Sequence, residues 1–128
     1  MFERKFFRCN HCGNLFEAVI DAGVPVFCCG EVMQALQANA GDGATEKHVP
    51  VIERNGDTVT VKVGSAAHPM LEEHSIQWIL LAQDGRTERV ALKPGEAPEA
   101  TFALRSKDAP LTAYEYCNLH GLWVAESE

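Results

Sequence analysis

Short stretches in which apolar and polar residues alternate cover most of the chain, and turn-forming residues separate one stretch from the next. Residues 58–63 show this best, because alternate valines would line one face of a strand. An Asn-Gly pair at 55–56 separates them from the β-rich stretch 49–53, which predicts a tight hairpin. The same reasoning predicts strands at residues 75–82, 87–92, 100–104, 111–116 and 122–125. Seven short strands without a helical pattern between them predict an antiparallel sandwich of immunoglobulin-like type.

The first quarter of the chain has a different character. It carries short β-like stretches at residues 5–8, 15–19 and 24–27, with too few apolar residues for a core of its own. Residues 37–45 are small, polar and glycine-containing, which predicts a linker. We therefore predict an all-β chain of two domains. A small domain over residues 1–37 needs a metal to hold it together, and the β-sandwich occupies residues 38–128.

Composition narrows the possible functions. The 128 residues are 46% hydrophobic and 23% charged, as in ordinary globular proteins, which argues against disorder and coiled coil. No apolar run approaches the ~20 residues of a membrane span and no signal peptide is evident, so we expect a cytoplasmic protein without a membrane partner. The net charge of -7 argues against nucleic-acid binding, which requires a basic surface. An anionic substrate would need a cation near its site for the same reason.

Four of the five cysteines lie in the first quarter of the chain: Cys9, Cys12, Cys28 and Cys29. The odd total and the lack of a secretion signal favour metal ligands over disulfides. The first two form a C-x2-C knuckle and the last two are adjacent, a set of thiolates that suits tetrahedral zinc or iron. Neighbouring residues on a strand point in opposite directions, so the adjacent pair can reach one metal only through a local kink, which Gly30 would help to form. His11, inside the knuckle, is expected to be a solvent-facing loop residue.

The other four histidines and the fifth cysteine fall in loops or at strand ends of the expected sandwich, where sites are usually built on β scaffolds. These residues are His48, His68, His74, Cys117 and His120. The C-x2-H step at the end of the set lets a sulfur and an imidazole reach one metal from a single turn. Five ligands exceed the four of a structural zinc site and would leave one position for a small molecule, which favours a catalytic metal. A blue-copper site stays open on the residues alone, although it would use only two of the histidines.

These motifs resemble those of the desulfoferrodoxin family, the two-iron superoxide reductases, along essentially the whole chain. The resemblance covers the two cysteine pairs, residues 46–50 (Glu-Lys-His-Val-Pro), residues 68–70 (His-Pro-Met), His74, and residues 117–123 (Cys-Asn-Leu-His-Gly-Leu-Trp). It implies a desulforedoxin-like domain over residues 1–37 whose four cysteines hold iron rather than zinc. It further implies a second, catalytic iron with the four sandwich histidines as equatorial ligands and Cys117 as the axial ligand.

The resemblance also implies an activity. The chain would reduce superoxide to hydrogen peroxide at the ferrous iron without forming dioxygen, with Lys47 as the local cation and Glu46 as a ligand of the oxidised iron. A homodimer and a rubredoxin-like electron donor are implied as well. Two other functions stay open on the residues alone, namely a zinc-stapled interaction module without catalysis and an electron-transfer protein with iron or copper.

Overall fold

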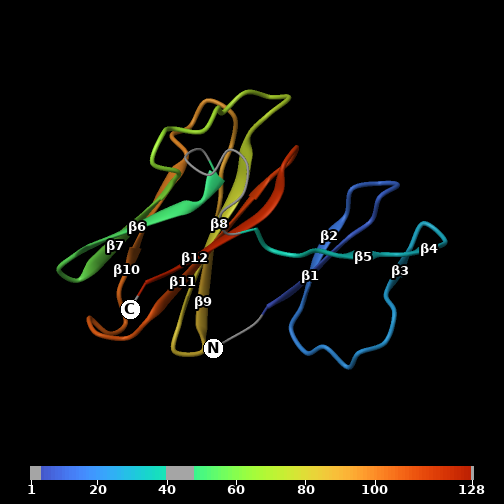
Figure 1. The fold of residues 1–128 in the computed structure, drawn as a ribbon, viewed down its shortest axis with the longest axis horizontal. Helices are drawn as coiled ribbons and strands as arrows, with labels where there is room; N and C mark the ends of the chain where they lie inside the picture. The colour runs from blue at the N-terminus through green and yellow to red at the C-terminus, as the bar shows by residue number, and fades with distance from the viewer. Residues whose placement is uncertain (1–3, 40–47, 128) are drawn as a thin grey trace. The chain divides into compact units, whose positions relative to one another are not determined.

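The computed structural model describes residues 4–39 and 48–127 and divides the chain into two compact units, Met1–Gln37 and Ala38–Glu128 (Figure 1). Strands form nearly all the regular structure of the described residues, which confirms the predicted all-β class. No helix within these two ranges is long and apolar enough to cross a membrane.

The first unit contains very short strands. The described strands are β1 Lys5–Arg8, β2 Leu15–Ala18, β3 Phe27–Cys28, β4 Glu31–Val32 and β5 Gln34–Ala35. One sheet has the order β2-β1-β5, and β3 pairs with β4. The predicted strands at residues 5–8 and 15–19 are confirmed. The strand predicted at residues 24–27 is wrong except at Phe27, because Pro25 lacks a backbone N–H and Val24 is exposed rather than packed on a sheet.

The second unit is an antiparallel β-sandwich. Its described strands are β6 Pro50–Asn55, β7 Thr58–Val63, β8 Ile76–Gln83, β9 Arg86–Ala91, β10 Glu99–Ala103, β11 Leu111–Cys117 and β12 Gly121–Ser127. One sheet has the order β10-β7-β6 and the other the order β12-β11-β8-β9. The predicted hairpin is confirmed, since Asn55 pairs with Thr58 across a turn in which Gly56 has a φ of 63°. The seven strands predicted for the sandwich are therefore all present among the described residues.

The core lies between the two sheets of the sandwich. Val59, Val61 and Val63 are at most 1% exposed and alternate with partly exposed residues, as the sequence pattern predicts. They belong to one apolar cluster with Phe102 of β10 and with residues of β8 and β11. Burial of this surface is the main stabilising contribution to the unit. Cys117 belongs to the same cluster, so one candidate metal ligand is anchored in the core.

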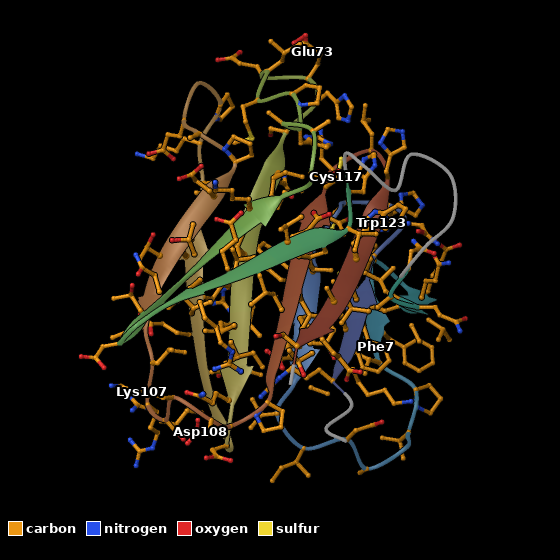
Figure 2. The ribbon with its side chains drawn as sticks, turned by 60° about the vertical axis from the view of Figure 1, so that its left-hand side comes forward. Phe7, Glu73, Lys107, Asp108, Cys117 and Trp123 are labelled. Carbon is orange, nitrogen blue, oxygen red and sulfur yellow. The ribbon has the colours of Figure 1, made fainter. Side chains whose placement is uncertain are left out.

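Several strand ends meet at one end of the sandwich. Pro50 at the start of β6 pairs with Val63 at the end of β7, while Cys117 at the end of β11 faces both Ile76 and Gly121. Figure 2 shows Cys117 at this end and Lys107, in the loop before β11, at the opposite end. The loops and turns at the Cys117 end carry the sandwich histidines.

Candidate metal centres

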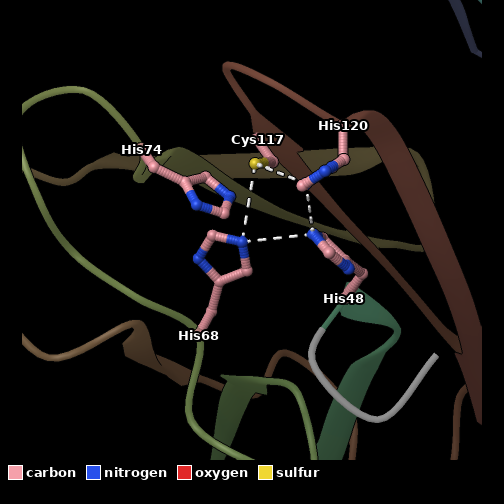
Figure 3. A group of neighbouring side chains, drawn as sticks. All are labelled: His48, His68, His74, Cys117 and His120. Carbon is pink, nitrogen blue, oxygen red and sulfur yellow. Dashed lines mark hydrogen bonds between the residues drawn. The ribbon is translucent and has the colours of Figure 1, made fainter. Parts of the chain in front are cut away.

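The five predicted ligands of the sandwich come from three separate parts of its chain. His48 precedes β6, His68 and His74 lie in the connection from β7 to β8, and Cys117 and His120 flank the turn from β11 to β12. The structure brings one ligand atom from each of the five within 4.8 Å of all the others (Figure 3). Residues up to 72 positions apart in sequence thus form a single cluster.

The four imidazole rings form a closed square. Neighbouring ring centroids lie 4.7 Å apart on three sides and 5.0 Å apart on the fourth, with interplanar angles between 70° and 82°. The Nε2 atom of His48 lies 3.2 Å from Nε2 of His68 and 3.1 Å from Nδ1 of His120. Two nitrogens that each bind one metal at about 2.1 Å and at a right angle would be about 3.0 Å apart. Adjacent corners of the square therefore have the spacing that one shared metal requires.

The sulfur of Cys117 lies over this square rather than beside it. Its Sγ is 3.5 Å from Nε2 of His68 and 3.8 Å from Nδ1 of His120, two atoms at opposite corners. Cys117 is fully buried, whereas His120 is exposed. The sulfur thus occupies the side of the square that faces the core.

The electrostatics of the site suit a bound cation. Burial lowers the pKa of His68 to about 4, so its ring is neutral and able to donate a lone pair at neutral pH. Burial also raises the pKa of Cys117, although the backbone N–H groups of His120 and Leu119 partly oppose this. A thiolate in this setting is costly unless a positive charge compensates it. A metal cation supplies that charge, and its binding would release the thiol proton.

Contacts outside the square hold the rings of two histidines and the backbone of a third. The Nδ1–H of His68 donates to the carbonyl oxygen of Pro69 at 2.7 Å, which leaves Nε2 free to bind a metal. His48 stacks on Trp123 with centroids 4.8 Å apart, and Nε1 of Trp123 donates to the carbonyl oxygen of His120 at 3.1 Å. This supporting role of Trp123 was not predicted, because ring stacking depends on three-dimensional placement.

The arrangement does not fit the alternative metals considered from the sequence. A structural zinc site has four ligands in a tetrahedron, and a square of four imidazoles below a sulfur does not match it. A blue-copper site has two histidines, a cysteine and often a distant methionine. In this protein all four rings converge, and the nearby thioether of Met70 accepts a hydrogen bond from the backbone N–H of Ile76 at 3.4 Å. The site fits an octahedral redox metal with five protein ligands best.

The four N-terminal cysteines form a second donor set within the first unit. Their sulfurs all lie within 4.8 Å of one another, and Sγ of Cys12 is 3.7 Å from Sγ of Cys28. Two sulfurs bound at about 2.3 Å to one tetrahedral metal would be about 3.8 Å apart. The kink expected at the adjacent pair is present, because φ is 54° at Cys29 and 77° at Gly30. This geometry fits a single tetrahedral metal.

Charge also favours a metal in the four-cysteine set. The backbone N–H of Cys12 donates to Sγ of Cys9 and is the main reason that the pKa of Cys9 falls to about 6. Hydrogen bonding with Cys12 is the main cause that raises the pKa of Cys29 to about 12. Four thiolates this close therefore need a cation to be stable together. His11 takes no part, since its side chain is 67% exposed and its Nε2 lies 4.0 Å from a carboxylate oxygen of Glu31, as the sequence predicts.

Three acidic or basic residues lie close in sequence to the proposed ligands His48 and Cys117. Glu46 and Lys47 lie outside the described residues. Glu115, which sequence reasoning missed, is fully buried two residues before Cys117, and neither carboxyl oxygen has a hydrogen-bond partner among the described residues. Burial raises the pKa of Glu115 to about 9. An acidic residue at a core-facing position of the alternating stretch 111–116 was the signal that could have revealed it.

Comparisons with known proteins agree with this geometry. The family described as Desulfoferrodoxin matches residues 40–126, and a desulfoferrodoxin from Nitratidesulfovibrio vulgaris is 48% identical over 96% of both chains. This chain belongs to the desulfoferrodoxin family.

Among solved structures, the superoxide reductase from Treponema pallidum is 41% identical to this chain with a TM-score of 0.80, and the match covers 96% of this chain and 98% of that structure's chain. The one-iron superoxide reductase from Giardia intestinalis is 33% identical with a TM-score of 0.58 and covers 65% of this chain and 98% of its own. The two donor sets match the two iron centres of desulfoferrodoxins.

Replacing Cys12 with Ser tests the four-sulfur centre. Because a hydroxyl is a poor substitute for a thiolate ligand, the variant should lose one iron per chain and retain the iron of the histidine site. Hydrogen exchange over the first unit should become faster, since metal binding contributes its folding energy. His11→Ala, which changes an exposed neighbour, should keep both irons. A Cys12→Ser protein that still holds both irons would disprove the assignment.

Replacing Glu115 with Gln tests the buried carboxyl. In the folded protein the Glu115 carboxyl keeps its proton up to about pH 9, whereas in the unfolded chain it loses the proton near pH 4.5. The native state therefore binds more protons than the unfolded state between these pH values. The stability of the parent protein should therefore fall as pH rises through this window, by at most about 1.4 kcal/mol per pH unit, relative to Glu115→Gln. Thermal unfolding of both iron-loaded proteins across the window measures this. Glu126→Gln, an exposed change on β12, should keep the pH dependence of the parent.

Proposed function

We propose that this chain is a superoxide reductase whose catalytic centre is the square of four imidazoles with Cys117 on its buried side. That donor geometry is the observation that carries the proposal. Ferrous iron bound there supplies the one electron that, with two protons, converts superoxide to hydrogen peroxide. The relatives named superoxide reductase support the same reaction.

The donor set decides the charge of the site. Four neutral imidazoles and one thiolate offset only one of the two charges of a ferrous ion, so one net positive charge stays at the centre. A small anion is drawn to that charge although the chain as a whole carries -7. A donor set with more carboxylates would repel superoxide, and neutral imidazoles avoid this.

The burial of Cys117 decides the side from which superoxide approaches. The sulfur belongs to the apolar cluster of the sandwich, so this side of the square faces buried side chains rather than solvent. Superoxide therefore approaches the side away from Cys117. The Cys117 thiolate would hold the metal from the buried side and would add electron density to it, which favours release of the reduced product.

Lys47 and Glu46 are proposed to complete the site. Both directly precede His48 in the sequence, so their chain positions adjoin a proposed ligand. Lys47 would add a second positive charge for the approaching anion. Glu46 would bind the oxidised centre once the product leaves, and Glu46→Ala should then alter the visible spectrum of the oxidised protein.

We also propose that residues 1–37 are a desulforedoxin-like iron domain and residues 38–128 the reductase domain, which works as a cytoplasmic homodimer supplied by a rubredoxin-like donor. None of the five cysteines forms a disulfide, which suits a reducing compartment. The first unit leaves large apolar side chains exposed, which supports a second copy as partner. These are Phe16, Val19, Ile20, Val24, Phe27 and Val32. Sedimentation at several concentrations would distinguish the dimer from a monomer.

Rapid mixing of the reduced, iron-loaded protein with superoxide tests the proposed activity. Hydrogen peroxide should form without dioxygen, and the visible spectrum should change to that of the oxidised iron. Equal amounts of dioxygen and peroxide would indicate a dismutase instead. An iron protein that cycles with reductants but does not react with superoxide would be an electron carrier, and a colourless protein with two zinc ions would be an interaction module.

Replacing Lys47 with Ile tests the proposed local cation. The bimolecular rate with superoxide should fall on the order of tenfold, and its dependence on ionic strength should flatten. Lys107→Ile is the matched control, because Lys107 pairs with Asp57 at the end of the sandwich opposite Cys117 and its loss changes the net charge equally (Figure 2). Equal rates for the two variants would remove Lys47 from the mechanism.

A further inference from the structure

His74 differs from the other three histidines in how it is held. His68 donates to a carbonyl oxygen, His48 stacks on Trp123, and the backbone at His120 accepts a hydrogen bond from the same Trp123. The Nε2 atom of His74 is buried, and no group among the described residues hydrogen-bonds it. The hydrogen bonds that hold this residue are those of its backbone within the loop.

Asn118 forms hydrogen bonds with that loop on both sides of His74. Its Oδ1 accepts a hydrogen bond from the backbone N–H of Ser75 at 3.0 Å, and its Nδ2 donates to the carbonyl oxygen of Glu73 at 3.0 Å. Its backbone N–H donates to the carbonyl oxygen of Ser75 at 3.3 Å. The backbone groups of His74 itself are satisfied by Leu71 within a turn, with N–O distances of 2.9 and 3.2 Å. The turn and the Asn118 clamp together leave His74 little freedom to shift.

The position of Asn118 gives these bonds their significance. It follows Cys117 directly, just beyond the change of register between Tyr116 and Cys117 in the ladder between β11 and β8. A register change disturbs regular pairing, so a further connection between the two segments that carry the sulfur and His74 stabilises them there. The Asn118 side chain makes that connection. A short side chain with one acceptor and one donor group is required, and Asp would supply only acceptors.

We propose that Asn118 is a positioning residue that fixes His74 relative to Cys117 and so sets the affinity and redox potential of the catalytic iron. The inference rests on the proposed iron site, because His74 and Cys117 act together only as ligands of one metal. Groups that orient metal ligands without touching the metal typically change metal affinity by about 10–100-fold when they are removed.

A purely structural role for Asn118 is the competing explanation, and Gln83 provides a matched control. Gln83 also clamps a loop through its side-chain amide, donating to the carbonyl oxygen of Ser106 at 2.7 Å and accepting from the backbone N–H of Arg105 at 2.9 Å. Gln83 is the last residue of β8, whereas Asn118 hydrogen-bonds the residues that directly precede the start of the same strand. The eight residues of β8 place the two clamps about 20 Å or more apart.

The test compares Asn118→Ala, Asn118→Asp and Gln83→Ala in the full iron-loaded chain. A ferrous chelator should remove the catalytic iron from Asn118→Ala about 10–100-fold more readily than from the parent, and the midpoint potential and sulfur-to-iron absorption band should shift. Asn118→Asp, which keeps the acceptor for Ser75, should give a smaller change in the same direction. Gln83→Ala should lower the unfolding temperature while leaving affinity, potential and absorption unchanged.

Two outcomes would overturn the proposal. One is parent-like iron affinity and absorption in both Asn118 variants, and the other is an equal loss of affinity in Gln83→Ala. Should Asn118→Ala fail to fold, Asn118→Asp alone decides between these results. None of the readouts uses superoxide, so iron that binds with the expected affinity but does not reduce superoxide would refute the proposed activity and leave the role of Asn118 standing.

Discussion

Five ligand atoms from three distant segments must meet at one point, and most of the sandwich follows from that requirement. Antiparallel pairing places the start of β6, the start of β8 and the end of β11 at the same end of the fold. The apolar cluster then holds Cys117 on the core side of the site, and the loops place the four imidazoles near its sulfur. The His68 ring is neutral and can donate a lone pair, and a thiolate at buried Cys117 needs a positive charge that a metal supplies.

The two metal centres relate to folding in opposite ways. The sandwich has a core of its own, so its site is built on a scaffold that burial already stabilises. The first unit has two-residue strands and exposed apolar side chains, so a metal bound by its four sulfurs contributes directly to its folding. Iron can therefore stabilise the fold of the first unit and serve as the reactive centre of the second.

Residue type and spacing in the sequence predict most of the strands and all of the candidate ligands. Alternating valines predicted β7, and Asn55-Gly56 predicted its hairpin, because both reflect local backbone geometry. The two-residue strands β4 and β5 were missed, since so short a stretch shows no periodicity. The ligand candidates could be named from the sequence, and the family resemblance implied that four histidines surround one metal. The contacts that hold the rings and the clamp by Asn118 could not be predicted, because both arise where separate strand ends meet. Glu115 was missed although its position in the strand faces the core, because the alternation was used to predict the strand and not the burial of each residue.

The proposed catalytic centre is one iron bound by four imidazoles and one sulfur. X-ray absorption at the iron edge tests this ligand set most directly, using reduced protein of the Cys12→Ser variant so that only the histidine site is loaded. We expect four nitrogen ligands at about 2.1 Å and one sulfur ligand at about 2.3 Å. A shell of four ligands, or one without sulfur, would contradict it.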